Sequence, residues 1–223
     1  MTFGTLYIVA TPLGNLEDIT LRAIRVLKEV DLIACEDTRH TRKLLNHFEI
    51  KTATTSYFEH SKLAKGGALI SQLIEGKNIA LVSDAGTPGI SDPGYPLIRQ
   101  AVEKNIPVVP IPGPSAAITA LSASGLPTDR FHFVGFLPPK EGKKRRILES
   151  VKSSEGTLIF YESPFRIQKT LTLMLEVFGN CSVALAHEMT KIHEGFFRGN
   201  LSAVIEEVKK VPEKGEWVIL CHC

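Results

Sequence analysis

Long apolar stretches are scarce in this sequence, which argues against a membrane-spanning chain. None of its apolar runs reaches the length of about 18 residues that a transmembrane helix requires. Residues 1–6 do not combine a basic stretch with an apolar one, so we expect no signal peptide. We therefore expect a cytoplasmic protein with no membrane partner, in which the four cysteines stay reduced.

Net charge is also low. The 26 Lys and Arg side chains nearly balance the 24 Asp and Glu side chains, which leaves +2 at pH 7. Composition alone therefore does not indicate a nucleic-acid-binding protein, and any basic surface must be local. Hydrophobic residues make up 43% of the chain and charged residues 22%, which excludes a disordered chain, a coiled coil and a collagen-like repeat.

The two common phosphate-binding motifs are missing. The segment after the first predicted strand reads Thr11-Pro12-Leu13-Gly14-Asn15-Leu16 and holds a single glycine. It fits neither G-x-G-x-x-G nor G-x-x-x-x-G-K-[ST], so a site for NAD or a nucleoside triphosphate is disfavoured. The ending Cys221-His222-Cys223 offers three ligands without a distant second pair, and we predict no metal site.

The sequence does contain an alternation of strand patterns and amphipathic helix patterns, which is typical of an α/β fold. We predict strands at 6–9, 32–34, 52–57, 79–82, 108–111, 131–136, 157–161, 182–186, 196–198 and 216–221. We predict helices at 20–28, 38–48, 62–75, 93–104, 116–124, 143–152, 165–178 and 201–210. The turn residues at 125–129 form the best internal boundary, which predicts domains 1–124 and 125–223.

Three loops rich in glycine and proline follow strands of the first half, at 11–16, 83–94 and 112–117. In open α/β sheets, ligands bind beyond the carboxyl ends of the strands. The small and stiff residues of loop 83–94 favour a ligand recognised by the backbone over a simple turn capped by Ser91 or Asp92. Loop 112–117 leads into a helix, where it either binds an acceptor group or only receives a cap from Ser115.

Acidic residues follow two of the predicted strands. Glu36 and Asp37 stand between strand 32–34 and the next helix, where they either cap that helix or act in catalysis. Glu162 follows strand 157–161, where it either accepts a hydrogen bond from a ligand hydroxyl or caps the helix that starts near Pro164.

Two groups of basic residues are candidates for contacts with phosphates. Arg39, Arg42 and Lys43 have the spacing i, i+3 and i+4, so they share one helix face. A denser cluster precedes and opens the helix 143–152 and consists of Lys140, Lys143, Lys144, Arg145 and Arg146. Each group is either a solvated helix surface or a site for nucleic-acid phosphates.

Five segments together resemble the bacterial ribosomal RNA small subunit methyltransferase I family, which belongs to the tetrapyrrole methylase fold group. They read Ala10-Thr11-Pro12-Leu13-Gly14-Asn15-Leu16-Glu17-Asp18-Ile19-Thr20, Cys35-Glu36-Asp37-Thr38-Arg39-His40-Thr41, Leu81-Val82-Ser83-Asp84-Ala85-Gly86-Thr87-Pro88, Pro112-Gly113-Pro114-Ser115-Ala116-Ala117-Ile118-Thr119-Ala120-Leu121 and Phe160-Tyr161-Glu162-Ser163. The resemblance runs from Gly4 to Leu220, and the motifs stand in the family's order.

The resemblance implies two α/β/α domains with S-adenosylmethionine in the cleft between them, and a homodimer. It implies methyl transfer to the ribose 2′-oxygen of a cytidine, cytidine 1402, in the decoding region of 16S ribosomal RNA. The small ribosomal subunit, and no DNA, would then be the partner. Porphyrin-methylating relatives carry G-x-G-P-G and G-G-D-P loops where this chain has Thr11-Pro12-Leu13-Gly14 and Ala85-Gly86-Thr87-Pro88, which favours RNA as the substrate.

Transferred residue by residue, the resemblance implies a donor site made by Leu13, Gly86, Thr87, Ile90, Ser115, Ala116, Tyr161, Ala186 and Glu216. For RNA we expect contacts from Arg39, Arg42, Lys143, Lys144, Arg145 and Arg146. A ribose hydroxyl is a poor nucleophile until its proton leaves, so a general base is useful. The candidates are Glu36, Asp37 and Asp84, with Glu59 and His60 as second choices.

Two other interpretations stay open. A methyltransferase for a tetrapyrrole or another small molecule would act without RNA. A non-catalytic RNA- or nucleotide-binding module of the same fold would bind the donor without turnover. Members of the family often carry an additional C-terminal segment, whereas this sequence stops at Cys223 after the last predicted strand. It is therefore either trimmed or a short member.

Overall fold

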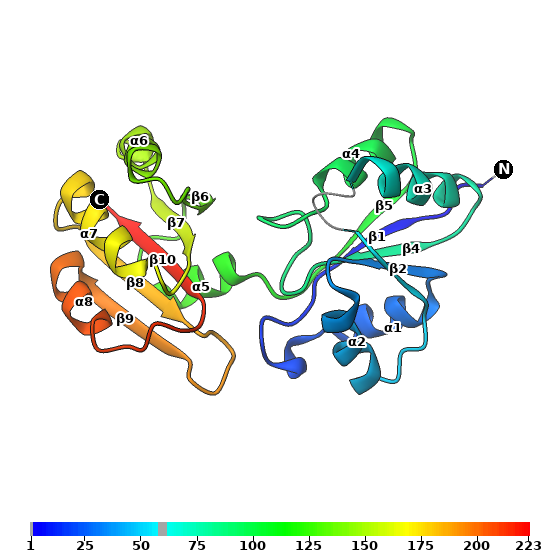
Figure 1. Cartoon of the computed structure of the whole chain (residues 1–223), viewed down its shortest axis with the longest axis horizontal. Coiled ribbons are helices and arrows are strands. Elements are labelled where there is room, and N and C mark those ends of the chain that lie inside the picture. Colours follow the sequence, from blue (N-terminus) through cyan, green and yellow to red (C-terminus); the bar gives the residue numbers. More distant parts are fainter. Residues whose placement is uncertain (1, 58–61) are drawn as a thin grey trace. The chain divides into compact units, whose positions relative to one another are not determined.

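The computed structural model describes residues 2–57 and 62–223, without the side chains of 62–65. Contacts divide the chain into two units, Met1–Ser115 and Ala116–Cys223, each built around its own five-stranded sheet (Figure 1). The division falls one helix before the predicted boundary at 124/125. The reason is that helix α5 (Ala116–Ser124) packs its small apolar residues on the second sheet.

The sheet of the first unit is fully parallel and has the strand order β3-β2-β4-β1-β5. Its strands are short and deeply buried at the centre, as the apolar runs predict. In chain order they are β1 (Leu6–Val9), β2 (Leu32–Cys35), β3 (Thr54–Ser56), β4 (Ile79–Val82) and β5 (Val108–Ile111).

Helices cover both faces of this sheet. On one face, α1 (Leu21–Glu29) and α2 (Thr38–His47) pack on residues such as Val9 and Ile33. On the other, α3 (Lys62–Ile74) and α4 (Tyr95–Glu103) pack on residues such as Ile8 and Leu81. A single-turn 3-10 helix, η1 (Leu16–Asp18), precedes α1. The first unit is therefore an α/β/α layer structure (Figure 1).

The connections that leave β1 and β4 run over opposite faces of the sheet. The connection that leaves β1 runs through α1 on one face, whereas the connection that leaves β4 runs through α4 on the other face. The two strands are neighbours and pair in parallel, with Leu6 opposite Ile79. In sheets of this kind, ligands bind beyond the carboxyl ends of the strands at such a switch point.

The sheet of the second unit is mixed and has the strand order β6-β7-β10-β8-β9. Only β6 and β7 run parallel to each other, and the other neighbours are antiparallel. Gly135, at a φ of 77°, lies at an irregularity of β6 next to Phe133. In chain order the strands are β6 (Phe131–Phe136), β7 (Thr157–Glu162), β8 (Ser182–His187), β9 (Gly195–Asn200) and β10 (Trp217–His222).

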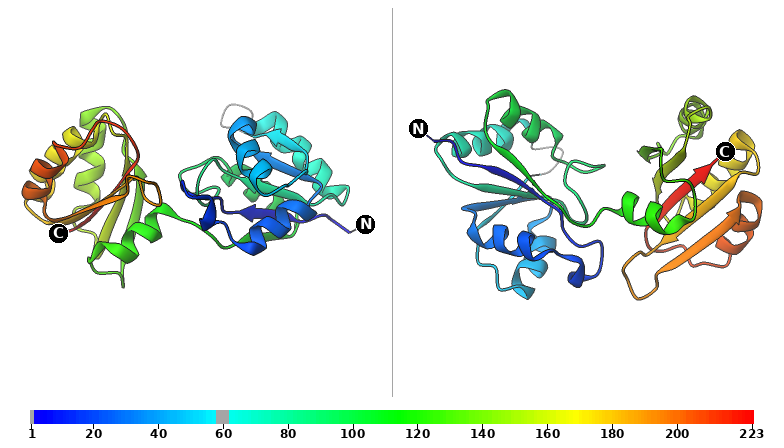
Figure 2. Two further views of the ribbon diagram at one scale, coloured as in Figure 1. Left: turned by 90° about the horizontal axis from the view of Figure 1, so that it is seen from below. Right: turned by 180° about the vertical axis from the view of Figure 1, so that it is seen from behind.

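The two faces of the second sheet are covered unequally. The helices α6 (Glu141–Val151), α7 (Ile167–Phe178) and α8 (Leu201–Val208) share one core with residues such as Phe160 and Ile219. Helix α5 packs on the opposite face, against residues such as Ile159 and Val218 (Figure 2). The described helices include none that is long and apolar enough to cross a membrane.

Every predicted strand and helix is present, and the differences lie at the ends. Helix α4 begins at Tyr95, two residues after the predicted start, because Pro96 rather than Pro93 occupies its first turn. Helix α6 begins at Glu141, so Lys140 is its N-cap residue and the basic cluster belongs to the first two turns of the helix.

Candidate functional site

The three loops rich in glycine and proline are joined to one another in the first unit. Thr11 and Gly86 exchange two backbone hydrogen bonds of 2.9 Å as an isolated antiparallel bridge. The Thr11 hydroxyl also donates to the carbonyl oxygen of Ser83 at 3.1 Å. The Thr87 hydroxyl donates to the carbonyl oxygen of Pro114 at 3.1 Å, which links the second loop to the third. The loops therefore form one structure at the carboxyl edge of the sheet.

Glycine is required where these loops approach one another. Gly86 has a φ of 77°, and a Cβ atom there would lie 3.3 Å from Cδ2 of Leu13. A Cβ atom on Gly113 would lie 2.9 Å from Cβ of Ala10, closer than side chains normally approach. A larger residue at either position would push the loops apart. The predicted donor residues Leu13, Gly86 and Thr87 thus lie together, and Ile90 follows on the same loop with an exposed side chain.

Two of the predicted catalytic acids meet at the ends of neighbouring strands. The backbone N–H of Asp37, after β2, donates to Oδ1 of Asp84, after β4, at 3.2 Å. Asp37 in turn caps α2, because its Oδ1 accepts from the backbone N–H of Arg39 at 2.8 Å. The parallel pairing of β2 with β4 explains why residues far apart in sequence lie close together here.

Asp37 also forms an ion pair with a residue that we expected to bind RNA. Nη2 of Arg39 lies 2.9 Å from Oδ2 of Asp37, and the Arg39 side chain is 88% exposed. Hydrogen bonds from Arg39 lower the pKa of Asp37 to about 2. A carboxylate so well stabilised is a weak proton acceptor. Asp37 therefore fits the role of a helix cap better than that of a general base.

Asp92 is an acid that sequence reasoning considered only as a helix cap. Burial raises the pKa of Asp92, a hydrogen bond with Ser83 lowers it and the nearby charge of Asp84 raises it, and together they bring it to about 6. A carboxyl group that titrates near neutral pH can both accept and release a proton. The only hint in the sequence was the unusual loop that holds Asp84 and Asp92 eight positions apart.

The other candidates for the general base are Glu36, Glu59 and His60. Glu36 is partly buried, next to Asp37 at the end of β2. Glu59 and His60 lie outside the described residues.

In the second unit, the side chain of Tyr161, a residue of β7, contacts the first turn of α5. Its hydroxyl accepts from the backbone N–H of Ala117 at 3.1 Å, and Ala116 is the first residue of that helix. The Tyr161 ring contacts Phe133 and Phe136 edge to face, with centroid distances of 5.0 and 5.4 Å. Tyr161 and Ala116, two predicted donor residues, thus belong to one local structure.

The other predicted donor residues lie elsewhere on the two units. Ala186 is a buried residue of β8, opposite Val218 of β10. Glu216 precedes β10 with a side chain that is 76% exposed and forms an ion pair with Lys191 at 2.9 Å. Ser115 is the last residue of the first unit. That the donor lies between the units stays a prediction.

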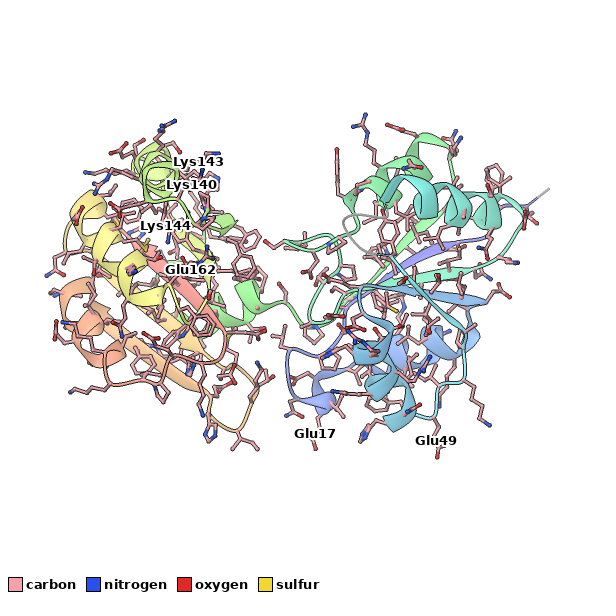
Figure 3. The ribbon with its side chains drawn as sticks, viewed as in Figure 1. Glu17, Glu49, Lys140, Lys143, Lys144 and Glu162 are labelled. Carbon is pink, nitrogen blue, oxygen red and sulfur yellow. The ribbon has the colours of Figure 1, made fainter. Side chains whose placement is uncertain are left out.

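The structure contradicts the predicted RNA-binding role of one residue of the basic cluster, Lys144. Lys144 is 5% exposed, and its Nζ atom lies 3.1 Å from Oε2 of the buried Glu162 and contacts Thr170 Oγ1 (Figure 3). It forms part of the core face of α6 together with Leu148 and Val151. Its ammonium group is therefore occupied inside the unit, and Lys144 leaves the candidate RNA-binding set.

The rest of the cluster stays at the surface. Arg145 forms an ion pair with Glu176 of α7. Lys140, Lys143 and Arg146 are exposed on α6 or at its cap. In the first unit, Arg42 is exposed on α2, one turn after Arg39. These side chains are accessible to phosphates, and their role in RNA binding stays a prediction.

The fold and these loops define a class of methyl-transferring enzymes. The family model described as Tetrapyrrole (Corrin/Porphyrin) Methylases matches residues 5–205. Among solved structures, cobalt precorrin-4 methyltransferase is similar over 97% of this chain and 94% of its own, with a TM-score of 0.70 and 16% identity. Diphthine synthase is similar over 98% and 89%, with a TM-score of 0.73 and 14% identity. These structures share the fold.

Curated relatives narrow the class. Proteins named ribosomal RNA small subunit methyltransferase I are 55% identical in Halalkalibacterium halodurans, 50% identical in Synechocystis sp. and 48% identical in Bacillus subtilis. Each comparison covers 97% of this chain, and respectively 75%, 78% and 74% of the relative. The chain therefore belongs to the ribosomal RNA small subunit methyltransferase I family, within the tetrapyrrole methylases.

Proposed function

We propose that this protein transfers the methyl group of S-adenosylmethionine to the ribose 2′-oxygen of a cytidine in the decoding region of 16S ribosomal RNA. The observation that carries the proposal is the set of three joined loops at the switch point, in a chain about half identical to curated ribosomal RNA methyltransferases. The partner would be the small ribosomal subunit, and the active form a homodimer in the cytoplasm.

The loops fit a donor that is recognised largely by backbone groups and apolar contact. Their glycines leave the space next to Leu13 and Ala10 that a Cβ atom would fill. In the first unit, the residues proposed to hold the donor are Leu13, Gly86, Thr87, Ile90 and Ser115. In the second unit they are Ala116, Tyr161, Ala186 and Glu216. When bound, S-adenosylmethionine supplies a methyl carbon already activated by the positive sulfur.

In such a transfer, the protein holds the acceptor oxygen in position and removes its proton. The acceptor oxygen must be held in line with the methyl carbon and the sulfur, because that alignment supplies much of the rate. The hydroxyl proton must also leave. We propose that the carboxyl pair of Asp84 and Asp92 receives it, because burial, with the nearby charge of Asp84, raises the pKa of Asp92 to about 6.

A direct experiment is transfer of tritiated methyl groups to purified small ribosomal subunits, with a tetrapyrrole such as uroporphyrinogen as the competing acceptor. We expect label in the RNA, and after digestion in 2′-O-methylcytidine. Label in the tetrapyrrole alone would favour a small-molecule methyltransferase instead. Donor binding without transfer to any acceptor would favour a binding module of the same fold.

A further inference from the structure

Two phenylalanine side chains are exposed at one edge of the second sheet. Phe136, the last residue of β6, is 58% exposed, and Phe165, between β7 and α7, is 73% exposed. The strands β6 and β7 are parallel, with Phe136 opposite Tyr161, so both segments leave the sheet at the same edge. Contiguous exposed apolar surface marks interaction sites, whereas single exposed hydrophobic side chains are ordinary, so the shared edge of these two rings is what draws attention to them.

A buried network holds these two segments together. Nη2 of Arg166, next to Phe165, lies 2.7 Å from Oε1 of Glu162. Nη1 of the same arginine donates to the carbonyl oxygen of Leu137, next to Phe136, at 3.3 Å. Oε2 of Glu162 accepts from the hydroxyl of Thr170 at 2.6 Å and from Lys144. Both phenylalanines are therefore attached to a fixed framework rather than to loose loops.

The surface beside the phenylalanines is basic. Lys140 is the N-cap residue of α6, and Lys143 follows in the first turn of that helix (Figure 3). Both side chains are exposed, as is Arg146 one turn later, against one exposed acid in that first turn, Glu141. The negative charge of Glu162 lies inside the unit and is balanced by Lys144 and Arg166. The framework thus presents aromatic rings next to an excess of positive charge.

We propose that Phe136, Phe165, Lys140 and Lys143 form a stacking surface for unpaired RNA. Bases stack on the two phenylalanine rings while the lysines contact the adjoining phosphates. Exposed aromatic rings next to positive charge are the combination by which proteins bind single-stranded nucleic acid, whose bases are free to stack. Paired bases already stack on one another, so a duplex would use only the lysines. This inference rests on the proposed function and names how its substrate is held.

The test is binding of a single-stranded RNA of about 12 nucleotides, close to the site sizes of known single-strand binders. The variants are Phe136→Ala, Phe165→Ala and Phe165→Leu, each of which removes an exposed aromatic ring and should leave folding intact. We expect each to weaken binding about tenfold, the usual effect of losing one stacked base. Leucine should not rescue, because it is apolar but has no flat ring.

Salt dependence and a matched control separate the two kinds of contact. Lys143→Gln should reduce the slope of log affinity against log salt by about 0.7, whereas the phenylalanine variants should keep the wild-type slope. Tyr95→Ala removes another exposed aromatic ring, 63% exposed on α4 of the first unit, and should bind like the wild type. Binding of an RNA duplex of the same length should not respond to the phenylalanine variants.

Unchanged affinity in the phenylalanine variants would overturn the stacking surface, as would full rescue by leucine. A change of oligomeric state in these variants would assign the phenylalanines to contact between two copies of the chain instead. Transfer of label to small subunits by the wild-type protein, measured in parallel, tests the proposed function separately. If that transfer occurs while the phenylalanines have no effect on RNA binding, only the stacking surface is wrong.

Discussion

A half-buried carboxyl group such as Asp92 makes stability depend on pH. Its pKa is raised to about 6 in the folded state, so its favourable contribution is complete below the unfolded value of 3.8 and is lost as pH rises through about 6. Asparagine cannot ionise. As the pH rises from 4 to 7.5, the free energy of unfolding of Asp92→Asn should therefore increase by about 1–2 kcal/mol relative to that of the wild type. Urea unfolding of both proteins at the two pH values measures this gain. An equal difference at both would show that Asp92 has an ordinary pKa.

Gly86 is a residue at which the joined loops leave little room for a side chain. Gly86→Ala should abolish calorimetric binding of S-adenosylmethionine, because the new Cβ atom would meet Leu13 and disturb the contact between the loops. Gly125 is the matched control, since it has the same φ of 77° but a Cβ atom added there would have no neighbour within 4 Å. Gly125→Ala carries the same backbone strain and should bind the donor normally. Equal donor affinity in the two variants would contradict the assignment of the loops.

Some of these residues could be predicted from the sequence and others could not. Gly86 and Thr87 stand in a loop whose composition indicates a ligand, and the structure places them against the other two loops. The raised pKa of Asp92 could not be predicted, because it depends on burial and on Asp84, which no local pattern records. Lys144 was wrongly predicted to bind RNA, because its basic neighbours in the sequence favoured an exposed position and Lys144 lies on the buried face of α6.

At the scale of elements, the contact between α6 and the end of β7 depends on the buried pair of Lys144 and Glu162. Removing Lys144 would leave the buried Glu162 carboxylate with Arg166 and Thr170 as partners, so the loss is smaller than the roughly 3–5 kcal/mol of a buried charge left uncompensated. We expect Lys144→Ala to lower the free energy of unfolding by about 1–3 kcal/mol. The neighbouring Lys143→Ala, on the exposed side of the same helix, should change it by less than about 0.5 kcal/mol. Thermal or urea unfolding of both variants measures the difference, and similar values would contradict the buried role of Lys144.

The order of elements was predictable because apolar runs and helical periodicity are local signals. Strands β4 and β5 and helix α5 have the predicted bounds. The start of α4 was not predictable, because Pro93 and Pro96 are both suited to the first turn of a helix and only Pro96 lies inside it. The spacing of Lys144, Leu148 and Val151 at i, i+4 and i+7 could have indicated the buried face of α6, since such residues share one side of a helix.

At the scale of the whole molecule, the two sheets differ in a way that the alternating pattern does not reveal. Both halves alternate strands with helices, yet the first sheet is parallel throughout and the second is mostly antiparallel. Strand pairing depends on contacts between distant segments, such as β7 with β10, and these leave no local signal. The switch point between β1 and β4, and with it the place of the joined loops, therefore became defined only in the folded chain.

The measurement that tests the central claim most directly identifies the atom that receives the methyl group. Small-subunit RNA labelled by the protein and tritiated S-adenosylmethionine is hydrolysed in alkali, where each free 2′-hydroxyl cleaves the adjoining phosphodiester bond. A methylated 2′-oxygen cannot do so, and we predict that the label is recovered in one alkali-resistant dinucleotide whose first nucleoside is cytidine. Recovery of the label in mononucleotides, which places the methyl group on a base, would contradict the account.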